Sequence, residues 1–370
     1  MDFELSEEQT MLRDTVRDLL SKTYDVEKLR EVTDTELGWS REVWKQLADI
    51  GILGLTFAEE DGGAGAGPEE LAAVLTEFGR ALAPEPYLDS VLVPGSLIAA
   101  TAEAEVRAEL LGGLASGDLL LAFAHQESGD RWPNSAVTAT VVDGKLTGTK
   151  SLVPHGDCAD KLVVSAREGN EVGLYLVEAN ADGVTATAYR THDRRRGAQI
   201  EFADAPAVRL GSGDATALIA DTEVTIQTAL CAEAVGAMER SLELTVEYLK
   251  ARKQFGVPLS MFQALTHRAA DMYTQLELAR SMSLYATTAL SDGLADPTIA
   301  SRAKLQICRS GRLIGQEAIQ MHGGIGMTAE YPVGHYVSRL TAISHTLGNA
   351  DDHLAALSAG VNSYDLVSLA

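Results

Sequence analysis

Hydrophobic residues recur at three- and four-residue intervals through the first third of the chain, and this spacing predicts helices. Further helices are predicted at 44–53 and at 71–78, the second ended by Gly79 and Pro84. The glycine-rich stretch 59–68 between them is predicted to be a turn, because its own carboxylates oppose an anion. The first helix should follow the acidic start Ser6-Glu7-Glu8, and its apolar series is Leu5, Met11, Leu12, Val16, Leu19 and Leu20.

The pattern changes to short strands between residues 119 and 220. The dipeptide Asp143-Gly144 is a hairpin-turn signal between two of them. Short strands separated by Asp, Gly and Asn turns predict a small antiparallel barrel or sandwich. The basic run from Arg190 to Arg196 is predicted to be a solvated loop, with a phosphate contact as the alternative. The predicted strands are 137–142, 145–148, 161–166, 173–178 and 198–202.

Long helical periodicity returns at residue 221 and continues to the end of the chain. Apolar positions from Leu230 to Val246, from Ala270 to Met282 and from Ala303 to Ala318 predict three long helices. We therefore expect an α+β protein of three domains. These are residues 1–118, helical, residues 119–220, a β-barrel, and residues 221–370, a helical bundle.

Composition narrows the environment and the partners. The 370 residues are 46% hydrophobic, enough for a large core, and the net charge of -23 disfavours nucleic acid and anionic membranes. The start has no basic region leading into an apolar run, and no run of 18 apolar residues occurs, so we expect a cytoplasmic protein. The three cysteines, Cys158, Cys231 and Cys308, fit no metal or redox spacing and are interpreted as small buried hydrophobes.

Two segments in the last third of the chain carry candidate chemistry. One is Ala251-Arg252-Lys253-Gln254-Phe255-Gly256 and the other is Gln320-Met321-His322-Gly323-Gly324-Ile325-Gly326. An arginine fork can hold two phosphate oxygens, and glycine lets a backbone approach a cofactor. Gln263 and Gln320 can hydrogen-bond a ribose or an adenine. Taken alone, the first segment also reads as a cationic helix end and the second as a helix stop.

The order and spacing of these motifs resemble acyl-CoA dehydrogenases over essentially the whole chain. The stretch Leu5-Ser6-Glu7-Glu8-Gln9 and the Gly62-Gly63-x-Gly65 loop share the resemblance. Within the family, residues 230–238, 334–336 and 348–354 are similar to the pimeloyl-CoA dehydrogenase small subunit. The resemblance implies a helical N-terminal domain, an antiparallel β-barrel and a four-helix bundle. It also implies an FAD-dependent oxidoreductase of lipid metabolism that acts on the CH–CH bond of an acyl-CoA.

The resemblance further implies that each FAD is shared between two subunits. Gln126 would lie beside the flavin ring bound by its own chain. The residues that would reach over to the FAD of a neighbouring subunit are Arg252, Gln254, Phe255, Gln263, Gln320, Gly323 and Gly324.

The ring side departs from the family pattern, whereas the reach-over side does not. The usual Thr-Glu-Pro segment reads His125-Gln126-Glu127-Ser128, and the usual aromatic-x-Thr segment reads Leu152-Val153-Pro154. Proline has neither an N–H nor a hydroxyl to offer flavin N5. The two family positions for the catalytic base are occupied by Leu347 and Ile226.

Removal of the α-proton nevertheless needs a positioned carboxylate. Glu233 lies two helical turns past Ile226 on a similar face, and Glu223 lies one turn before it. Glu233 is the candidate base. Its alternatives are a buried structural carboxylate or a contact between subunits.

Three functions stay open. The first is an FAD-binding subunit that completes the site of a larger catalytic subunit in a heterotetramer and passes electrons to an acceptor protein. The second is a self-sufficient homo-oligomeric acyl-CoA dehydrogenase with Glu233 as its base. The third is a non-redox acyl-CoA-binding protein, disfavoured because only FAD requires Arg252 and Gly323-Gly324. No metal site is expected.

Overall fold

The computed structural model describes residues 5–129, 131–133 and 137–361. Residues 1–4 of the acidic start and the last nine residues of the predicted C-terminal domain therefore lie outside the described residues. The first block of the chain is helical, as predicted. Its elements are α1 (Glu7–Thr23), α2 (Val26–Thr33), α3 (Arg41–Asp49), η1 (Glu59–Asp61), α4 (Pro68–Ala81), η2 (Leu88–Leu92), α5 (Val93–Thr101) and α6 (Ala104–Ser116).

The start of α1 is set by its sequence. The Ser6 hydroxyl accepts a hydrogen bond from the Gln9 N–H, and the Gln9 side chain accepts one from the Ser6 N–H, which forms a capping box. Val16 and Leu20, predicted for the apolar face, are fully buried. The helix thereby presents its apolar side to α4.

The middle of the chain is an eight-stranded sheet with the strand order β6-β7-β3-β2-β4-β5-β8, and β1 pairs with β4 off this path. The predicted β-sheet domain is confirmed; its sheet is largely antiparallel but mixed, because β1 runs parallel to β4 in the register Leu121 to Lys161. β1 was missed because its four residues show no alternation. The strands are β1 (Leu121–Ala124), β2 (Thr140–Val142), β3 (Lys145–Pro154), β4 (Lys161–Glu168), β5 (Glu171–Glu178), β6 (Val184–Arg190), β7 (Arg196–Pro206) and β8 (Val208–Leu210).

The predicted hairpin at Asp143-Gly144 is confirmed and joins β2 to β3. Both residues have positive φ, 49° and 72°, as a two-residue type I′ turn requires. Val141 and Leu146, opposite each other across this hairpin, are buried in the second core of the molecule, which lies within the sheet.

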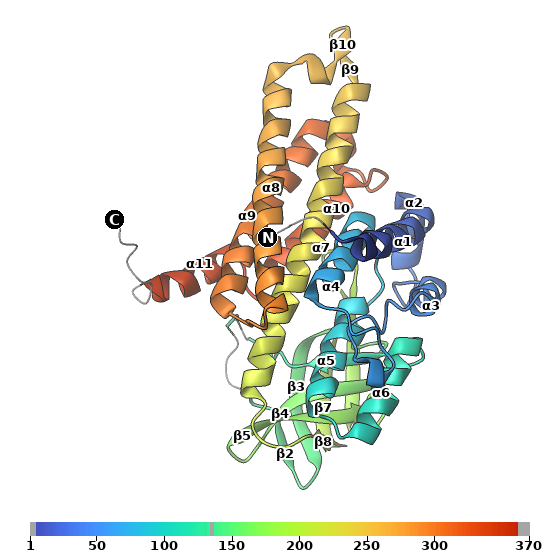
Figure 1. The fold of residues 1–370 in the computed structure, drawn as a ribbon, viewed down its shortest axis with the longest axis vertical. Coiled ribbons are helices and arrows are strands. Elements are labelled where there is room, and N and C mark those ends of the chain that lie inside the picture. The colour runs from blue at the N-terminus through green and yellow to red at the C-terminus, as the bar shows by residue number, and fades with distance from the viewer. Residues whose placement is uncertain (1–4, 130, 134–136, 362–370) are drawn as a thin grey trace.

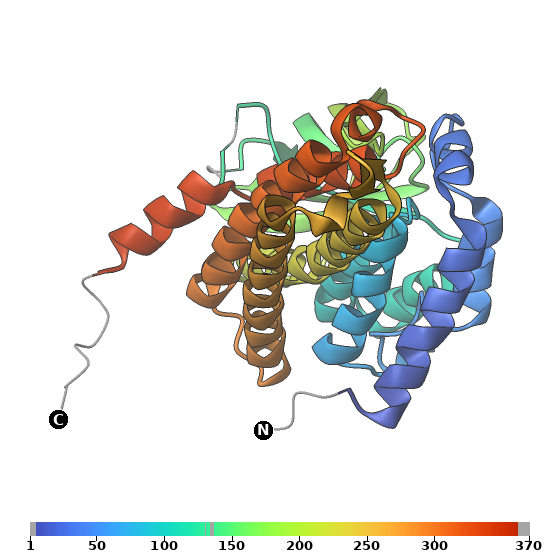
Figure 2. The ribbon, with the colours of Figure 1, turned by 90° about the horizontal axis from the view of Figure 1, so that it is seen from above.

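The last block forms the predicted helical bundle. Figure 1 shows α7 rising from the sheet to the opposite end of the molecule, with α8 and α9 beside it. Figure 2 shows the last helix, α11, pointing away from the bundle. At 36 residues, α7 is about 54 Å long. The elements are α7 (Thr216–Ala251), β9 (Lys253–Gln254), β10 (Val257–Pro258), η3 (Leu259–Met261), α8 (Gln263–Ser291), α9 (Pro297–His322), η4 (Gly323–Met327), α10 (Val333–His345) and α11 (Ala350–Ala359).

The backbones of α4 and α7 touch where the helices cross. A Cβ on Gly79 would lie 1.9 Å from the Glu233 carbonyl oxygen, and a Cβ on Gly236 would lie 1.8 Å from the Thr76 carbonyl oxygen. Gly79 therefore sits inside α4 as a packing glycine, and the prediction that it ends the helix was wrong. The helix ends at Ala81, and Leu82 follows with φ 53°.

Among the described residues, no helix is long and apolar enough to cross a membrane. The same residues contain no group of three or more His, Cys, Asp or Glu side chains arranged to hold a metal ion.

Candidate functional site

A cleft opens between the sheet, the first turns of α7 and the segment that joins α10 to α11. It has a volume of about 680 Å³, and we call it the main cleft. A smaller cavity of about 90 Å³, the inner chamber, adjoins it. The residues that line both are Asp89, Gln126, Leu152, Pro154, Ile226, Thr346 and Leu347. All three blocks of the chain thus contribute to one site, which includes Gln126, Pro154 and both of the usual base positions.

Two buried side chains hold the turn that carries Leu347 by hydrogen bonds to its backbone carbonyl groups. Lys304, which is 0% exposed, donates from Nζ to the carbonyl oxygens of Ile343 at 2.6 Å and Gly348 at 3.3 Å. Gln227 Nε2 donates to the Leu347 carbonyl oxygen at 3.2 Å. Leu347 itself has φ 53°. The apolar side chain at the usual base position is therefore set in a rigid turn.

The segment from His125 to Glu127 is tied to the sheet by a buried lysine. Lys150 Nζ donates to Glu127 Oε1 at 2.7 Å and to the His125 carbonyl oxygen at 3.0 Å. Burial opposes ionisation of Glu127, but its bonds with Lys150 and Thr138 lower its pKa to about 2. Glu127 therefore has a structural role, which is to hold the loop that carries Gln126.

Two carboxyl groups line the inner chamber, those of Asp89 and Glu223. Burial raises the pKa of Glu223 to about 7, against the opposing effect of a hydrogen bond with Trp132. Burial likewise raises the pKa of Asp89 to about 6, although Arg195 and Arg339 act against it. His125 Nε2 lies 3.9 Å from Glu223 Oε1. Burial, and then Lys150, lower the pKa of His125 to about 4, so this histidine is neutral at pH 7.

Glu233, the predicted base, does not line this site. Arg339 Nε and Nη2 donate to its two oxygens at 2.7 and 2.6 Å, and Arg195 Nη2 donates to Oε1 at 2.8 Å. Burial disfavours the charged form, but the two arginines hold the pKa of Glu233 below its usual range. A carboxylate with both oxygens bound to guanidinium groups is a poor proton acceptor. The assignment of Glu233 as base is therefore corrected to a structural ion pair.

The basic run from Arg190 to Arg196 forms the connection between β6 and β7, and the structure pairs its arginine side chains with carboxylates. Arg190 and Arg194 contact Asp34 at 3.2 and 2.5 Å. Arg196 contacts Asp157 at 2.6 Å, and Arg195 reaches Glu233. The arginines of this segment are therefore ion-paired, and Arg195 and Arg196 also line the main cleft.

The predicted reach-over residues lie at the far end of α7, which we call the tip (residues 252–263 and 320–327). Tyr248, near the end of α7, packs its ring 4.6 Å from that of His322, at the end of α9. This contact brings the two predicted motifs to the same end of the bundle. Arg252, Gln254, Gln263, Gly323 and Gly324 are all exposed there, and so is Gln320.

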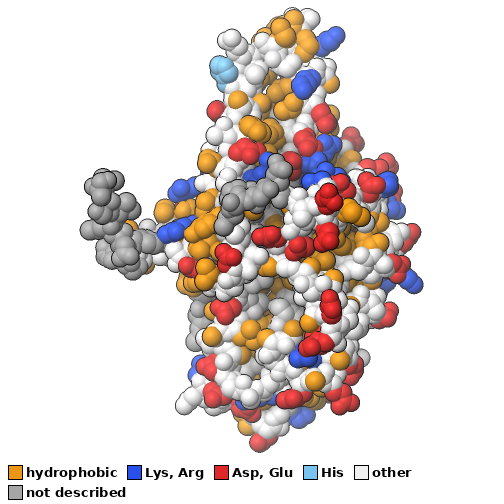
Figure 3. Space-filling model, viewed as in Figure 1, with side chains coloured by type: hydrophobic (Ala, Val, Ile, Leu, Met, Phe, Trp, Pro, Cys, Tyr) orange, Lys and Arg blue, Asp and Glu red, His pale blue; other side chains and the backbone are white. Residues whose placement is uncertain are grey.

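The tip presents apolar side chains to solvent. Phe255 is 92% exposed and Met327 77% exposed. Phe255 and Gly256 form the turn between β9 and β10 with φ 54° and 82°. An exposed aromatic ring on a left-handed backbone position is unfavourable for an isolated chain. Figure 3 shows hydrophobic side chains at this upper end of the molecule beside Lys and Arg side chains, a combination typical of a contact surface.

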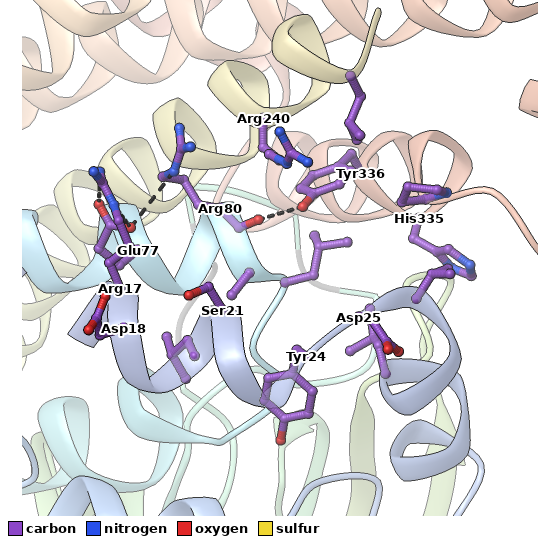
Figure 4. Close-up of a pocket in the computed structure, with 17 residues that line it drawn as sticks. Arg17, Asp18, Ser21, Tyr24, Asp25, Glu77, Arg80, Arg240, His335 and Tyr336 are labelled. Atoms are coloured by element: carbon purple, nitrogen blue, oxygen red, sulfur yellow. Dashed lines mark hydrogen bonds and ion pairs between the residues drawn. The ribbon is translucent and has the colours of Figure 1, made fainter. Parts of the chain in front are cut away.

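A third cavity, of about 580 Å³, lies between the N-terminal helices and the bundle (Figure 4). Its cations are already neutralised. Arg17 donates to both oxygens of Glu77 at 2.9 and 2.6 Å, and Arg80 donates to both oxygens of Glu243 at 3.0 Å. The Tyr336 hydroxyl donates to the Arg80 carbonyl oxygen. We therefore interpret this cavity as a joint between domains and not as the ligand site.

Comparison with known proteins identifies the family. The acyl-CoA dehydrogenase N-terminal domain matches residues 6–118, and the acyl-CoA dehydrogenase C-terminal domain matches residues 227–361. Acyl-CoA dehydrogenase IpdE2 from Mycobacterium tuberculosis is 33% identical over 356 residues, which cover 96% of this chain and 98% of that protein. The chain belongs to the acyl-CoA dehydrogenase family.

Other members of the acyl-CoA dehydrogenase family match over similar lengths. FadE27 from Mycobacterium tuberculosis is 29% identical and covers 96% of this chain and 97% of its own length. The structure of the ChsE4-ChsE5 complex from Mycobacterium tuberculosis has a TM-score of 0.91 at 28% identity, covering 99% of this chain and 100% of that one. The steroid ACAD Tcur3481-Tcur3483 has a TM-score of 0.88 at 33% identity, covering 96% and 98%.

Sequence reasoning missed four residues that line the main cleft: Asp89, Trp132, His155 and Arg339. Asp89 follows the segment Pro84-Glu85-Pro86-Tyr87-Leu88, and no periodic pattern marked it. Trp132 packs against the turn after Leu347, where a Cβ on Gly348 would lie 2.7 Å from its ring. The proximity of Arg339 to Glu233 depends on the crossing of α7 and α10, and no local signal reports that contact.

Proposed function

We propose that this chain is an FAD-binding subunit of an acyl-CoA dehydrogenase assembly, in which its tip completes the FAD site of a larger partner subunit. The observation that carries the proposal is a distance within one chain. The 29 residues from Glu223 in the inner chamber to Arg252 at the tip span about 44 Å of helix. One flavin nucleotide cannot touch Gln126 and Arg252 of the same chain, so the two sets of contacts serve different cofactors.

The tip fits the diphosphate and adenosine half of FAD. Arg252 is exposed and pairs with no carboxylate of the described residues. An added Cβ on Gly324 would meet no atom within 4 Å, and its φ is not left-handed, so the chain itself does not require glycine there. A ligand that approaches the backbone supplies the missing reason. Gln254, Gln263 and Gln320 offer hydrogen-bond donors and acceptors around the same surface.

The ring side of this chain is less suited to oxidation of an acyl-CoA. FAD, when bound, supplies the acceptor for the hydride that leaves the β-carbon of the substrate. Next to the ring, Pro154 offers no donor, and Leu347 and Ile226 cannot accept a proton. Gln126 can still bond a flavin edge, and Leu152 can pack on it. The residues on this side are thus suited to orienting a cofactor and poorly suited to catalysing oxidation of an acyl-CoA.

Relatives and surface chemistry support a partner. The ChsE4-ChsE5 structure is a complex of two proteins. The exposed Phe255, Met261 and Met327 give the tip an apolar surface to bury against a second subunit. We propose a heterotetramer that takes an acyl-CoA thioester, passes electrons to an acceptor protein and works in lipid metabolism in the cytoplasm.

The test is to purify the full chain without a partner, measure its flavin content, and assay it with saturated acyl-CoA thioesters and an artificial electron acceptor. We expect little or no turnover, because Pro154 leaves the N5 side of a bound flavin without a hydrogen-bond donor. Activity should appear when a larger acyl-CoA dehydrogenase subunit is co-expressed. Robust turnover by the chain alone would contradict the proposal. An assembly that binds acyl-CoA but no flavin would favour the non-redox binding protein.

A further inference from the structure

We propose that Glu223 is a proton-transfer residue of this chain, placed to remove the α-proton of an acyl thioester bound in the inner chamber. This inference rests on the proposed function only in that the chamber receives an acyl-CoA. It does not require that hydride transfer occurs in the same subunit. The base positions of the family are apolar here, and the structure brings a different carboxylate to the same space.

The placement follows from the helical geometry of α7. Glu223 and Ile226 are three residues apart and face the same side of the helix, about 4.5 Å apart along its axis. Both line the inner chamber, with Leu347 contributed from the turn after α10. The Glu223 carboxyl group is 17% exposed. It therefore occupies the chamber within one helical turn of the alternative base position.

The surroundings of Glu223 suit a group that changes its protonation state. His125 Nε2 is 3.9 Å away, and this histidine is neutral at pH 7, so it adds no positive charge beside the carboxyl group. Trp132 bonds to the side chain without adding charge. Asp89, on η2, is a further titratable group of the chamber. A carboxyl group with a pKa near 7 is matched to proton transfer at neutral pH.

Glu233, on the same helix, has the opposite electrostatic surroundings. Its two oxygens accept three hydrogen bonds from Arg195 and Arg339, so its charge is fully compensated. Asp89 has a weaker claim than Glu223, because Arg195 and Arg339 favour its ionised form. Among the carboxyl groups of the chamber and the adjoining α7 turns, Glu223 is the one placed and poised to exchange a proton.

The proposed step conserves atoms and charge. The Cα–H bond of the thioester breaks, the proton forms an O–H bond on the Glu223 carboxylate, and the electron pair is delocalised onto the thioester carbonyl as an enolate. The reverse step returns a proton from Glu223 to Cα. In D₂O the carboxyl proton exchanges with solvent, so the return step places deuterium on Cα. No oxidant is consumed.

The test is exchange of the α-protons in D₂O, followed by mass spectrometry of the recovered thioester. The full-length chain, with FAD added, is incubated with butyryl-CoA and with the more acidic acetoacetyl-CoA, and protein-free exchange is subtracted. Glu223→Gln should lower the exchange rate by about 100- to 10,000-fold while thioester binding persists. Wild-type exchange should rise with pH through an apparent pKa about 7 and then level off, because only the ionised carboxylate accepts a proton.

A matched control is available on the same helix. Asp221 is exposed and two residues earlier, so Asp221→Asn removes the same charge outside the chamber and should leave exchange unchanged. Glu223→Asp should restore part of the lost rate, which a purely structural role would not produce. Unchanged exchange in Glu223→Gln would overturn the proposal. So would loss of exchange in Asp89→Asn alone, which would assign the role to Asp89.

The exchange and flavin-content experiments distinguish failure of the Glu223 assignment from failure of the proposed function. If the wild-type chain binds thioester but shows no exchange above buffer, Glu223 is not a base, yet the tip can still complete a partner's FAD site. If instead exchange is observed but substitution of Arg252 leaves flavin content unchanged, the subunit role fails and the assignment of Glu223 stands.

Discussion

Arg339 on α10 donates two hydrogen bonds to Glu233 on α7, from Nε to Oε1 at 2.7 Å and from Nη2 to Oε2 at 2.6 Å. Arg339 also donates from Nη1 to Asp193 at 2.7 Å, and Arg195 joins the same cluster. Three segments that are far apart in the sequence therefore meet in one buried ion network beside the main cleft. The network fixes the position of α10, and with it the turn that carries Leu347.

The first prediction concerns this pair. Glu233→Gln leaves two buried guanidinium groups without their carboxylate, and we expect it to lower the free energy of unfolding by about 3–5 kcal/mol. Glu247→Gln, on the exposed side of the same helix, should change it by less than about 0.5 kcal/mol. Urea denaturation measures both. Full stability of Glu233→Gln together with loss of proton exchange would restore Glu233 as the base.

The second prediction concerns the crossing of α4 and α7. Gly79→Ala forces a methyl group into the backbone of Glu233, and we expect destabilisation at or beyond the upper end of about 1–3 kcal/mol. Gly112→Ala, on α6, has no neighbour within 4 Å of the new Cβ and should stabilise by about 0.5–1 kcal/mol. Thermal unfolding compares the two. Equal effects would mean that the helices do not meet at Gly79.

The third prediction concerns Arg252. Arg252→Ala removes the proposed charge-assisted hydrogen bonds to the FAD diphosphate. It should weaken flavin binding by about 1.5–3 kcal/mol, which is roughly 10- to 100-fold, without unfolding the chain. The flavin absorbance per subunit of the purified assembly measures this. Lys250→Ala, in the last turn of α7, serves as the control for a lost positive charge at the same end. Unchanged flavin content in Arg252→Ala would remove the tip from the cofactor site.

The fourth prediction concerns pH. Burial, and then the charge of Arg195, lower the pKa of His155 in the folded chain to about 3, from 6.5. Below pH 6.5 His155 is protonated in the unfolded chain but stays neutral in the folded chain. This residue therefore lowers the free energy of unfolding as the pH drops from 6.5 towards 3. His155→Asn tolerates the φ of 52° and removes the titration. Its unfolding free energy should therefore fall less than that of the wild type between pH 7 and pH 4.5, and equal slopes would exclude His155.

Local chemistry explains what could be predicted from the sequence. The helical series around Val16 and Leu20, the capping box at Ser6 and the hairpin at Asp143-Gly144 depend on residues within a few positions of one another. The same holds for the order helix, sheet, helix, because each block has its own hydrophobic period. The motifs at Arg252 and Gly323 were found because their residue types and order, read along the chain, suffice to identify the family.

Only the tertiary structure decided which carboxylate enters the site. Glu223 and Glu233 flank Ile226 on similar faces of one helix, and periodicity cannot separate them. The difference lies in their neighbours: Glu233 meets Arg339, brought over by α10, whereas Glu223 meets the chamber beneath the sheet. The parallel pairing of β1 with β4 and the pairing of the Arg190–Arg196 run were hidden for the same reason. Contacts between distant segments depend on how helices and strands pack, and packing leaves no local period in the sequence.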